Sequence, residues 1–321
     1  MHHFFTFILS FSLFCLPGLS MAQNEEQTLL ASNASLETTE SVANEESRKV
    51  LSYRTQGSGP VIYLFADGPG MNSHYLDEVG KALADHGYTA VVPESKHANF
   101  SGDMEAEPIS LKGYVEDIEY LRKSRGDDKI ILFGHKWGGI LAMAYMAEYG
   151  SHVNKVVLSG SAGTHMGYFQ DYGSRMVQKV SPYERNLIGQ IKDSLSNGGD
   201  PLLLGQELLR ISALAQLHNK EKYASELEDR VIDITLFNEK VYSHMIRQMR
   251  TDGYDLRDDL MRFYSPVLVV QGEFDINGKQ HAMNLADSFP DASLQFIEES
   301  ASYPWIENPE AYYEAIAGFM K

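Results

Sequence analysis

The sequence predicts an α/β fold with a mostly parallel central sheet, flanking helices and an inserted helical cap. The first observation is an alternation of short apolar runs with amphipathic stretches over residues 61–159. Such alternation indicates parallel strands joined by crossover helices. The second is a change to helical patterns over residues 160–262, after which strand patterns resume. A helical insertion into one α/β core accounts for both observations.

Each element has its own signal. Short apolar or alternating runs predict strands at 61–65, 88–92, 130–133, 155–159, 267–271 and 293–297. Apolar residues at helical spacing predict helices at 110–125, 280–289 and 309–321. In the inserted segment Ser181 and Glu184 form a capping box with Pro182 at the first helical position, and Pro201 begins a second helix in the same way.

The N-terminal residues predict export. Residues 4–19 are predominantly apolar and uncharged, and Ser20-Met21-Ala22 follows them with the small-x-small pattern of a cleavage site. We interpret residues 1–22 as a secretory signal peptide, which predicts a secreted or periplasmic protein. An uncleaved anchor is the alternative, because no Lys or Arg precedes the apolar run. Phe14 before Cys15 does not fit a lipoprotein site, so no stable membrane insertion is expected after cleavage.

Residues 23–49 are rich in Glu, Ser, Thr and Asn and contain no aromatic residue, which predicts a disordered acidic linker. The α/β core then comprises residues 50–159 and 263–321, and the helical cap comprises residues 160–262.

Composition and spacing exclude several classes of partner. A formal charge of −17 argues against nucleic acid, because binding it requires a basic surface that displaces phosphate counterions. The histidines lack companions at metal-ligand spacing. Gly68, Gly70, Gly138 and Gly139 do not have the spacing of a phosphate or dinucleotide loop. We therefore expect no metal and no cofactor.

The predicted strand at 130–133 runs into G-H-K-W-G-G at 134–139 and then into an apolar helix. This pattern is typical of a nucleophile elbow, whose central side chain projects at the top of the sheet and whose next backbone N–H helps to hold an oxyanion. Here the central residue is Lys136 and the next is Trp137. An ammonium group cannot perform the acyl chemistry of a hydroxyl.

Four segments carry a resemblance to a known family. They are FADGPGMNSHYL at 65–76, GHKWGGILAMAY at 134–145, YDLRDDLMRFYSPVLVVQGEFD at 254–275 and YPWIENPEAYYEAIAGFM at 303–320. With them, residues 51–321 resemble the α/β-hydrolase fold and, within it, the capped proline iminopeptidase-like group.

The resemblance implies the site positions. It places Lys136 where the family has its nucleophilic serine, Asp275 at the triad acid and Ser302 where the triad histidine belongs. Asp67 and Trp137 stand at the oxyanion-hole positions. The carboxylate of Asp67 would oppose the negative charge that such a hole stabilises.

Two arrangements of these residues are possible. We hypothesise that Lys136 lies between Asp67 and Asp275 with Ser302 hydrogen-bonded to it, which would keep the lysine protonated. A desolvated, unpaired Lys136 would instead have a lowered pKa and could form a Ser-Lys dyad with Ser302.

Another histidine, such as His74, His97 or His165, is a further candidate for the base.

Two functions follow. The preferred one is a non-catalytic pseudo-hydrolase that binds an unknown small molecule or peptide in the cleft between cap and core. The alternative is an unconventional hydrolase, an aminopeptidase or esterase that works without the serine.

Overall fold

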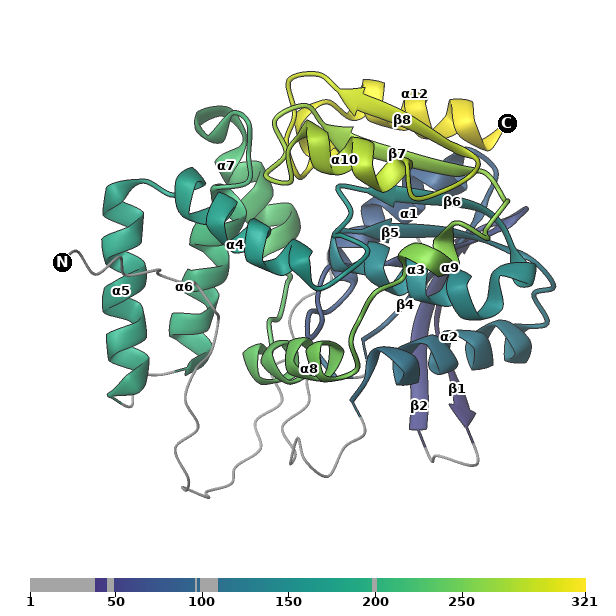
Figure 1. Cartoon of the computed structure of the whole chain (residues 1–321), viewed down its shortest axis with the longest axis horizontal. Coiled ribbons are helices and arrows are strands. Elements are labelled where there is room, and N and C mark those ends of the chain that lie inside the picture. Colours follow the sequence, from purple (N-terminus) through teal and green to yellow (C-terminus); the bar gives the residue numbers. More distant parts are fainter. Residues whose placement is uncertain (1–37, 45–48, 96, 99–108, 198–200) are drawn as a thin grey trace.

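The structure is a computed structural model that describes residues 38–44, 49–95, 97–98, 109–197 and 201–321. One 8-stranded sheet, in the order β1-β2-β4-β3-β5-β6-β7-β8, forms its centre (Figure 1). Strand β2 pairs antiparallel with β1 and β4, and the remaining neighbours pair in parallel. The predicted mostly parallel sheet is confirmed.

Strands β3 to β8 coincide closely with the apolar runs of the sequence, whereas β1 and β2 do not. Their bounds are β1 Thr38–Asn44, β2 Lys49–Gly57, β3 Val61–Phe65, β4 Thr89–Pro93, β5 Ile130–His135, β6 Val153–Ser159, β7 Val267–Gly272 and β8 Ala292–Ile297. The core helices are α1 Asp77–Asp85, α2 Leu111–Arg125, α3 Trp137–Tyr149, α10 Lys279–Ala286, α11 Pro304–Glu307 and α12 Pro309–Met320, with short turns η1 His74–Leu76 and η2 Gly150–His152.

Both faces of the sheet are covered by helices. In β3, Tyr63 and Phe65 belong to the hydrophobic cluster that includes α2, α3 and α10, whereas Ile62 and Leu64 belong to the cluster that includes α1 and α12. Successive strand residues point to opposite faces, so a strand buried on both faces is apolar throughout. This explains why short continuous apolar runs marked the strands in the sequence.

The segment between β6 and β7 is helical, as the change of pattern predicts. It contains α4 Gly167–Lys179, α5 Pro182–Ser196, α6 Pro201–Leu214, α7 Lys220–Leu227, η3 Glu228–Ile232, α8 Glu239–Thr251 and α9 Arg257–Leu260. Helices α5 and α6 project from one end of the molecule (Figure 1). A small hydrophobic cluster of their own, with Ile191 and Leu208, holds these two helices together.

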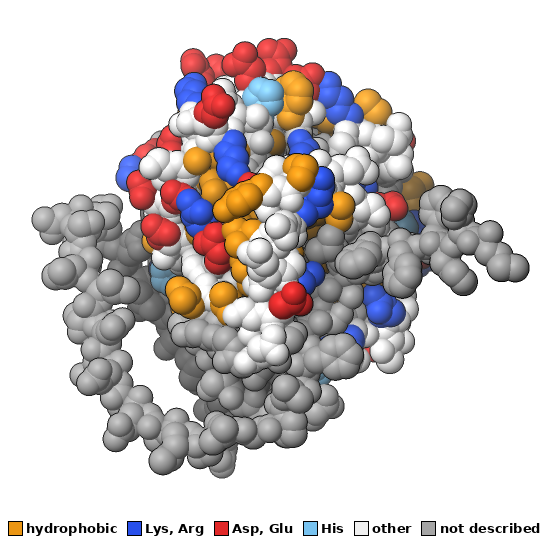
Figure 2. Space-filling view, turned by 90° about the vertical axis from the view of Figure 1, so that its left-hand side faces the viewer, with side chains coloured by type: hydrophobic (Ala, Val, Ile, Leu, Met, Phe, Trp, Pro, Cys, Tyr) orange, Lys and Arg blue, Asp and Glu red, His pale blue; other side chains and the backbone are white. Residues whose placement is uncertain are grey.

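The end face formed by the cap is mixed in character. Figure 2 shows apolar side chains near its centre, interspersed with Lys and Arg, and acidic side chains grouped towards its top. Tyr183 and Leu203 of α5 and α6 are among the most exposed large apolar residues. The formal charge of −17 therefore does not produce one uniform acidic surface here.

Hydrogen bonds join the cap to the core near Ser302. The N–H of Ser302 donates to the carbonyl of Gln216 at 3.1 Å. The Glu307 carboxylate accepts from the N–H groups of His218 at 2.7 Å, Asn219 at 3.1 Å and Ala301 at 2.7 Å. These bonds connect the α6–α7 link to the loop that carries Ser302.

The predicted linker was wrong in its last part. Strand β1, Thr38–Asn44, lies inside residues 23–49 and pairs antiparallel with β2 at the edge of the sheet. Polar composition predicted disorder, but an edge strand gains its hydrogen bonds from a neighbour and needs only one covered face. Strand β2 likewise begins at Lys49 and was not predicted.

The other predictions for the N-terminus concern residues that the structure does not describe. Residues 1–37, with the expected signal peptide at 1–22 and the start of the linker, lie outside the described residues. Within the described part of the chain, no helix has the length and apolar character needed to span a membrane.

Candidate functional site

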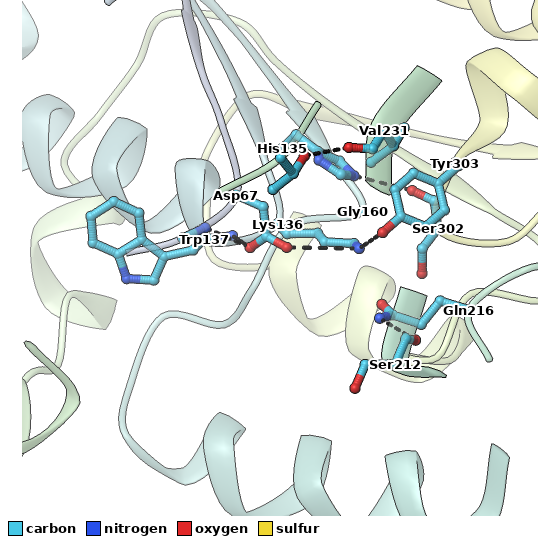
Figure 3. Close-up of polar contacts among 12 residues, drawn as sticks. Asp67, His135, Lys136, Trp137, Gly160, Ser212, Gln216, Val231, Ser302 and Tyr303 are labelled. Atoms are coloured by element: carbon cyan, nitrogen blue, oxygen red, sulfur yellow. Dashed lines mark hydrogen bonds and ion pairs between the residues drawn. The ribbon is translucent and has the colours of Figure 1, made fainter. Parts of the chain in front are cut away.

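The site lies at the carboxyl ends of the parallel strands. Asp67 follows β3, Lys136 follows β5 and Asp275 follows β7, while Ser302 and Tyr303 precede α11. Because parallel strands end at the same edge of a sheet, residues distant in the sequence meet there. Figure 3 shows the side chains of Asp67, Lys136 and Tyr303 converging on one another.

The turn at Lys136 has the geometry of an elbow. Lys136 has φ 50° and ψ −112°, a conformation that costs a non-glycine residue on the order of 1–3 kcal/mol. The glycines allow the helix to approach the strands, since a Cβ on Gly138 would lie 2.0 Å from the carbonyl oxygen of Phe65. The sequence pattern therefore predicted the turn correctly, with lysine at its strained position.

The Lys136 ammonium is enclosed and paired. Its Nζ donates to the hydroxyl of Tyr303 at 2.9 Å, lies 4.1 Å from the centroid of that ring and lies 3.7 Å from Oδ2 of Asp67. Only 8% of the residue is exposed. Burial alone lowers the pKa of Lys136, but Tyr303, Asp67 and Asp275 outweigh it and raise that pKa above its ordinary value.

The Asp67 carboxylate accepts hydrogen bonds from one backbone N–H of the elbow and one of its own loop. Its Oδ1 accepts from the N–H of Gly68 at 2.8 Å and from the N–H of Trp137 at 3.3 Å. The N–H of Asp67 itself donates to the hydroxyl of Tyr75 at 2.6 Å. The sequence places Asp67 at an oxyanion-hole position, where its N–H would be a donor. In the structure, the side-chain carboxylate of Asp67 lies in the hole instead and accepts the N–H of Trp137.

Ser302 and Asp275 form a separate pair. The hydroxyl of Ser302 donates to Oδ2 of Asp275 at 2.8 Å, and the N–H of Asn277 donates to Oδ1 at 2.7 Å. Burial raises the pKa of Asp275 above its ordinary value, although both hydrogen bonds and Lys136 act in the opposite direction.

The hypothesised cluster was correct for Asp67 and wrong for two other members. The hydrogen bond of Lys136 goes to Tyr303 and not to Ser302, whose hydroxyl is used by Asp275. Among the described residues the ion pair of Lys136 is with Asp67, and Asp275 acts on it only at longer range. The Ser-Lys dyad is also not formed, because the Ser302 hydroxyl donates to Asp275 and the Lys136 ammonium donates to Tyr303. Sequence reasoning missed Tyr303 because an aromatic residue beside Ser302 has no spacing signal.

His135 joins the two halves of the site and was not predicted. Its Nε2 lies 3.1 Å from the carbonyl oxygen of Ser302, and its Nδ1 lies 2.8 Å from the hydroxyl of Tyr75. A carbonyl can only accept, so Nε2 carries the hydrogen and Nδ1 accepts from Tyr75. Burial, and then the charge of Lys136, lower the pKa of His135 well below its ordinary value. A neutral imidazole thus links the Asp67 loop to the Ser302 loop.

The histidines considered as alternative bases contact other groups. His97 Nδ1 lies 3.0 Å from the hydroxyl of Tyr114, His74 Nδ1 lies 3.7 Å from Glu94, and His165 Nδ1 accepts from the N–H of Gly167 at 3.1 Å. None of these contacts reaches Lys136 or Ser302. Within the described chain, no three His, Cys, Asp or Glu side chains are grouped so that they could hold a metal ion.

Comparison with known proteins agrees with this architecture. Residues 60–309 match the α/β-hydrolase fold family. The chain belongs to this family. It is 21% identical over 284 residues to a proline iminopeptidase of Clostridioides difficile, covering 85% of this chain and 93% of that protein. It is 27% identical over 264 residues to a proline iminopeptidase of Thermoplasma volcanium, covering 79% and 86%.

Solved structures of α/β hydrolases share the fold. An α/β-fold family hydrolase from Bacillus anthracis superimposes with a TM-score of 0.67 at 20% identity, covering 89% of this chain and all of that one. The predicted resemblance to the proline iminopeptidase-like group of the family is thus confirmed. Within this α/β-hydrolase fold, the elbow position holds Lys136 and the loop after β8 holds Ser302.

Proposed function

We propose that this protein is a non-catalytic member of the α/β-hydrolase fold family that binds a small molecule or peptide between its cap and its core. The observation that carries the proposal is the elbow lysine held between Tyr303 and Asp67. A protonated lysine has no lone pair, so it is neither a nucleophile nor a base. The raised pKa of Lys136 keeps it in that form at neutral pH.

The other triad positions support the same conclusion. Acyl transfer by the triad needs an imidazole that removes the proton of the nucleophile. The position next to Asp275 instead holds Ser302, whose hydroxyl already donates to that carboxylate. His135 is neutral but both of its ring nitrogens are used, by Tyr75 and by the carbonyl of Ser302.

The Asp67 carboxylate is the third support. An oxyanion hole works because preorganised donors face developing negative charge. Here the N–H of Trp137 already faces a carboxylate. A substrate oxyanion would have to displace Asp67 and would meet its charge.

A hydrolysis assay tests the proposal. The purified protein and its Lys136→Ala variant are incubated with p-nitrophenyl acetate and with L-proline p-nitroanilide. We expect both proteins to release p-nitrophenol and p-nitroaniline at the rate of buffer alone. Turnover by the natural protein that disappears in Lys136→Ala would make the lysine catalytic and establish the unconventional hydrolase. Turnover that survives in Lys136→Ala would also contradict the proposal, because a different group would then be catalytic.

We further propose that the protein is exported, on the basis of residues 1–22. The apolar run and the small residues at Ser20 and Ala22 support a signal peptide. Mass spectrometry of the protein from fractionated cells is expected to find a chain that begins at Gln23 outside the cytoplasm. A chain that begins at Met1 and remains in the cytoplasmic or membrane fraction would contradict this.

A further inference from the structure

One face of the cap helix α4 is directed at the core. Tyr168, Arg175 and Lys179 stand at positions i, i+7 and i+11 of this helix and therefore share a face. The Tyr168 hydroxyl donates to Oδ1 of Asn277 at 2.8 Å, and the Lys179 ammonium donates to the carbonyl of Phe274 at 3.1 Å. Arg175 lies between these two contacts, at the boundary of cap and core.

The guanidinium of Arg175 has no hydrogen-bond acceptor among the described residues. Its Nε and Nη2 are both buried and make no hydrogen bond there. The guanidinium lies near the ring of Tyr168, with 5.8 Å between Cζ and the ring centroid. Attraction to a ring does not replace an acceptor, so these two buried donors are energetically unfavourable.

The carboxylates on the elements around Arg175 do not pair with it. Asp171 lies one turn earlier on α4 and is exposed, and within the described chain no hydrogen bond or ion pair joins it to Arg175. Asp275, which follows β7, accepts from Ser302 and Asn277 instead. The charge of Arg175 is thus left for a group from outside this part of the chain.

Other arginines of the protein use the same two nitrogens to bind a carboxylate. Arg122 donates from Nε and Nη2 to the two oxygens of Glu119, at 2.8 Å in each case. Arg230 binds Glu78 with the same pair of nitrogens. These two N–H groups are parallel and match the planar fork of a carboxylate. In Arg175 this same edge lacks an acceptor, so a carboxylate is the group that fits it.

The rings beside Arg175 favour an aromatic ligand. The ring of Tyr168 has its centroid 5.7 Å from that of Tyr172 and 5.1 Å from that of His281 on α10. Burial, and then Tyr168 and Asp67, raise the pKa of Tyr172 well above its ordinary value, so this ring is within electrostatic reach of the elbow. Aromatic rings pack favourably against one another. A ring attached to the carboxylate would therefore lie along α4 towards the candidate site.

We propose that Arg175 binds the carboxylate of a small aromatic acid that enters between cap and core. The carboxylate accepts from Nε and Nη2, and the ring of the ligand packs against Tyr168 and Tyr172. Both nitrogens are covered in this structure, whereas Arg175 as a whole is partly exposed, so its flexible side chain turns to meet the ligand. This inference rests on the proposed binding function and deepens it by naming a binding residue and a class of ligand.

The Nε–H signal of Arg175 in ¹⁵N NMR spectra gives a direct test. The purified protein is titrated at constant ionic strength with benzoate, benzamide and cyclohexanecarboxylate. Benzoate and benzamide have nearly the same shape and differ in charge, whereas cyclohexanecarboxylate keeps the charge and lacks the aromatic ring. The Arg175→Lys variant identifies the signal. Ligands of this size have limited affinity, so each titration continues to about 50 mM.

We expect benzoate to shift the Arg175 signal in a saturable manner. Its Kd should be at least about 10-fold lower than that of benzamide, because a charged acceptor forms stronger hydrogen bonds. No saturable shift with benzoate, or equal Kd values for benzoate and benzamide, would overturn the inference. Cyclohexanecarboxylate should bind more weakly than benzoate, and equal binding would overturn the aromatic part of the inference.

Two positions on the same face of α4 provide a matched pair of variants. Lys179 is exposed and lies one turn after Arg175, so Lys179→Gln and Arg175→Gln each remove one positive charge from this face. The line width of the benzoate ¹H signals reports binding by both variants. Arg175→Gln should weaken binding by about 10-fold or more, and Lys179→Gln by less than about 2-fold, because exposed charges are screened. Equal weakening would reduce the effect to net charge and contradict a specific site.

Stability gives a second readout that needs no ligand. A buried charged donor without a partner is unfavourable, so Arg175→Met should raise the midpoint of urea unfolding. Lys179→Met is the control and should not raise it, because its ammonium already has an acceptor. An unchanged or lower midpoint for Arg175→Met would show that the fold itself uses the guanidinium, which would contradict a role in ligand binding.

The two proposals fail in different ways. Hydrolysis of the test substrates by a protein that also binds benzoate through Arg175 would remove the proposed non-catalytic function and leave this site. No benzoate binding and no hydrolysis would remove this site and leave a non-catalytic protein with another ligand.

Discussion

The Asp67 carboxylate accepts a hydrogen bond from the backbone N–H of Trp137, with 3.3 Å between Oδ1 and the nitrogen. This N–H is at the N-terminus of α3, where the helix dipole and the unsatisfied N–H groups favour an anion. In an acyl-transfer enzyme that anion belongs to the reacting substrate. In this chain a side chain of the protein supplies it, and the same carboxylate pairs with Lys136.

Removal of Asp67 should therefore be necessary to restore hydrolysis. We expect Lys136→Ser/Ser302→His to stay weak on p-nitrophenyl acetate, and the triple variant that adds Asp67→Gly to be faster in kcat/KM. The expected gain is about 10²-fold, the value of one oxyanion-hole donor. Asp117 of α2 lines the same small cavity as Asp67, so Asp117→Asn on the same double variant is the control that removes a carboxylate and leaves Asp67 in the hole. Equal rates for the double and triple variants would show that Asp67 does not block the hole.

The Lys136–Asp67 pair should show strong coupling. Lys136→Met leaves the Asp67 charge without its partner, so we expect a loss of about 2–3 kcal/mol in the free energy of unfolding, below the range for fully buried pairs because Asp67 is partly exposed. Lys136→Met/Asp67→Asn should recover most of the loss. Urea unfolding of the two single variants and the double variant completes the cycle. Additive losses would mean that the pair contributes nothing.

The coupling should not change across neutral pH. The pKa of Lys136 is raised in the folded protein, so its contribution is present below the unfolded pKa of about 10.4 and is lost as pH rises through the folded value. The coupling energy between positions 136 and 67 should therefore be constant from about pH 6 to 9 and fall only in more alkaline solution.

Ser302→Ala should destabilise the protein more at neutral pH than at acidic pH. Burial raises the folded pKa of Asp275, so the stability contributed by the protonated form is lost as pH rises through that value. Removing the Ser302 hydrogen bond raises the pKa of Asp275 further, so more folding stability is lost as pH rises. We expect a cost of about 1–3 kcal/mol near pH 7.5 and a smaller one near pH 4.5, measured by urea unfolding.

A second buried serine provides the control for that experiment. Ser161 donates its hydroxyl to the carbonyl of Ala162 and not to a carboxylate. Ser161→Ala should therefore cost the same at both pH values. A cost of Ser302→Ala that is equally independent of pH would show that its hydroxyl does not stabilise the Asp275 carboxylate.

His135 should stay neutral in the folded protein at mildly acidic pH. Burial and Lys136 lower its pKa well below 6.5, whereas in the unfolded chain it takes up a proton below about that value. Stability from this residue is thus present at pH 7 and lost as pH falls, by about 2 kcal/mol at pH 5. Ring ¹⁵N NMR should show hydrogen on Nε2 down to about pH 5, and His135→Gln should remove this part of the acid loss. Titration of His135 near pH 6.5 would contradict the assignment.

The strand-helix order, the cap insertion and the elbow could be read from the sequence because their signals are local. Apolar runs are the mark of strands buried on both faces, and Ser110 accepts from the N–H of Gly113 as the N-cap of α2. Strand β1 could not be predicted in this way, because its order comes from pairing with β2 and not from its own composition.

The sequence by itself determined which residues stand at the strand ends: Asp67, Lys136, Asp275 and Ser302. Only the tertiary structure decided how they pair. The bond between Lys136 and Tyr303 joins residues 167 positions apart, and the choice of Tyr303 over Ser302 depends on differences of a few ångströms in a buried space. Spacing along the chain carries no information about such distances, because they are set by how the loops after β3, β5, β7 and β8 pack against the cap.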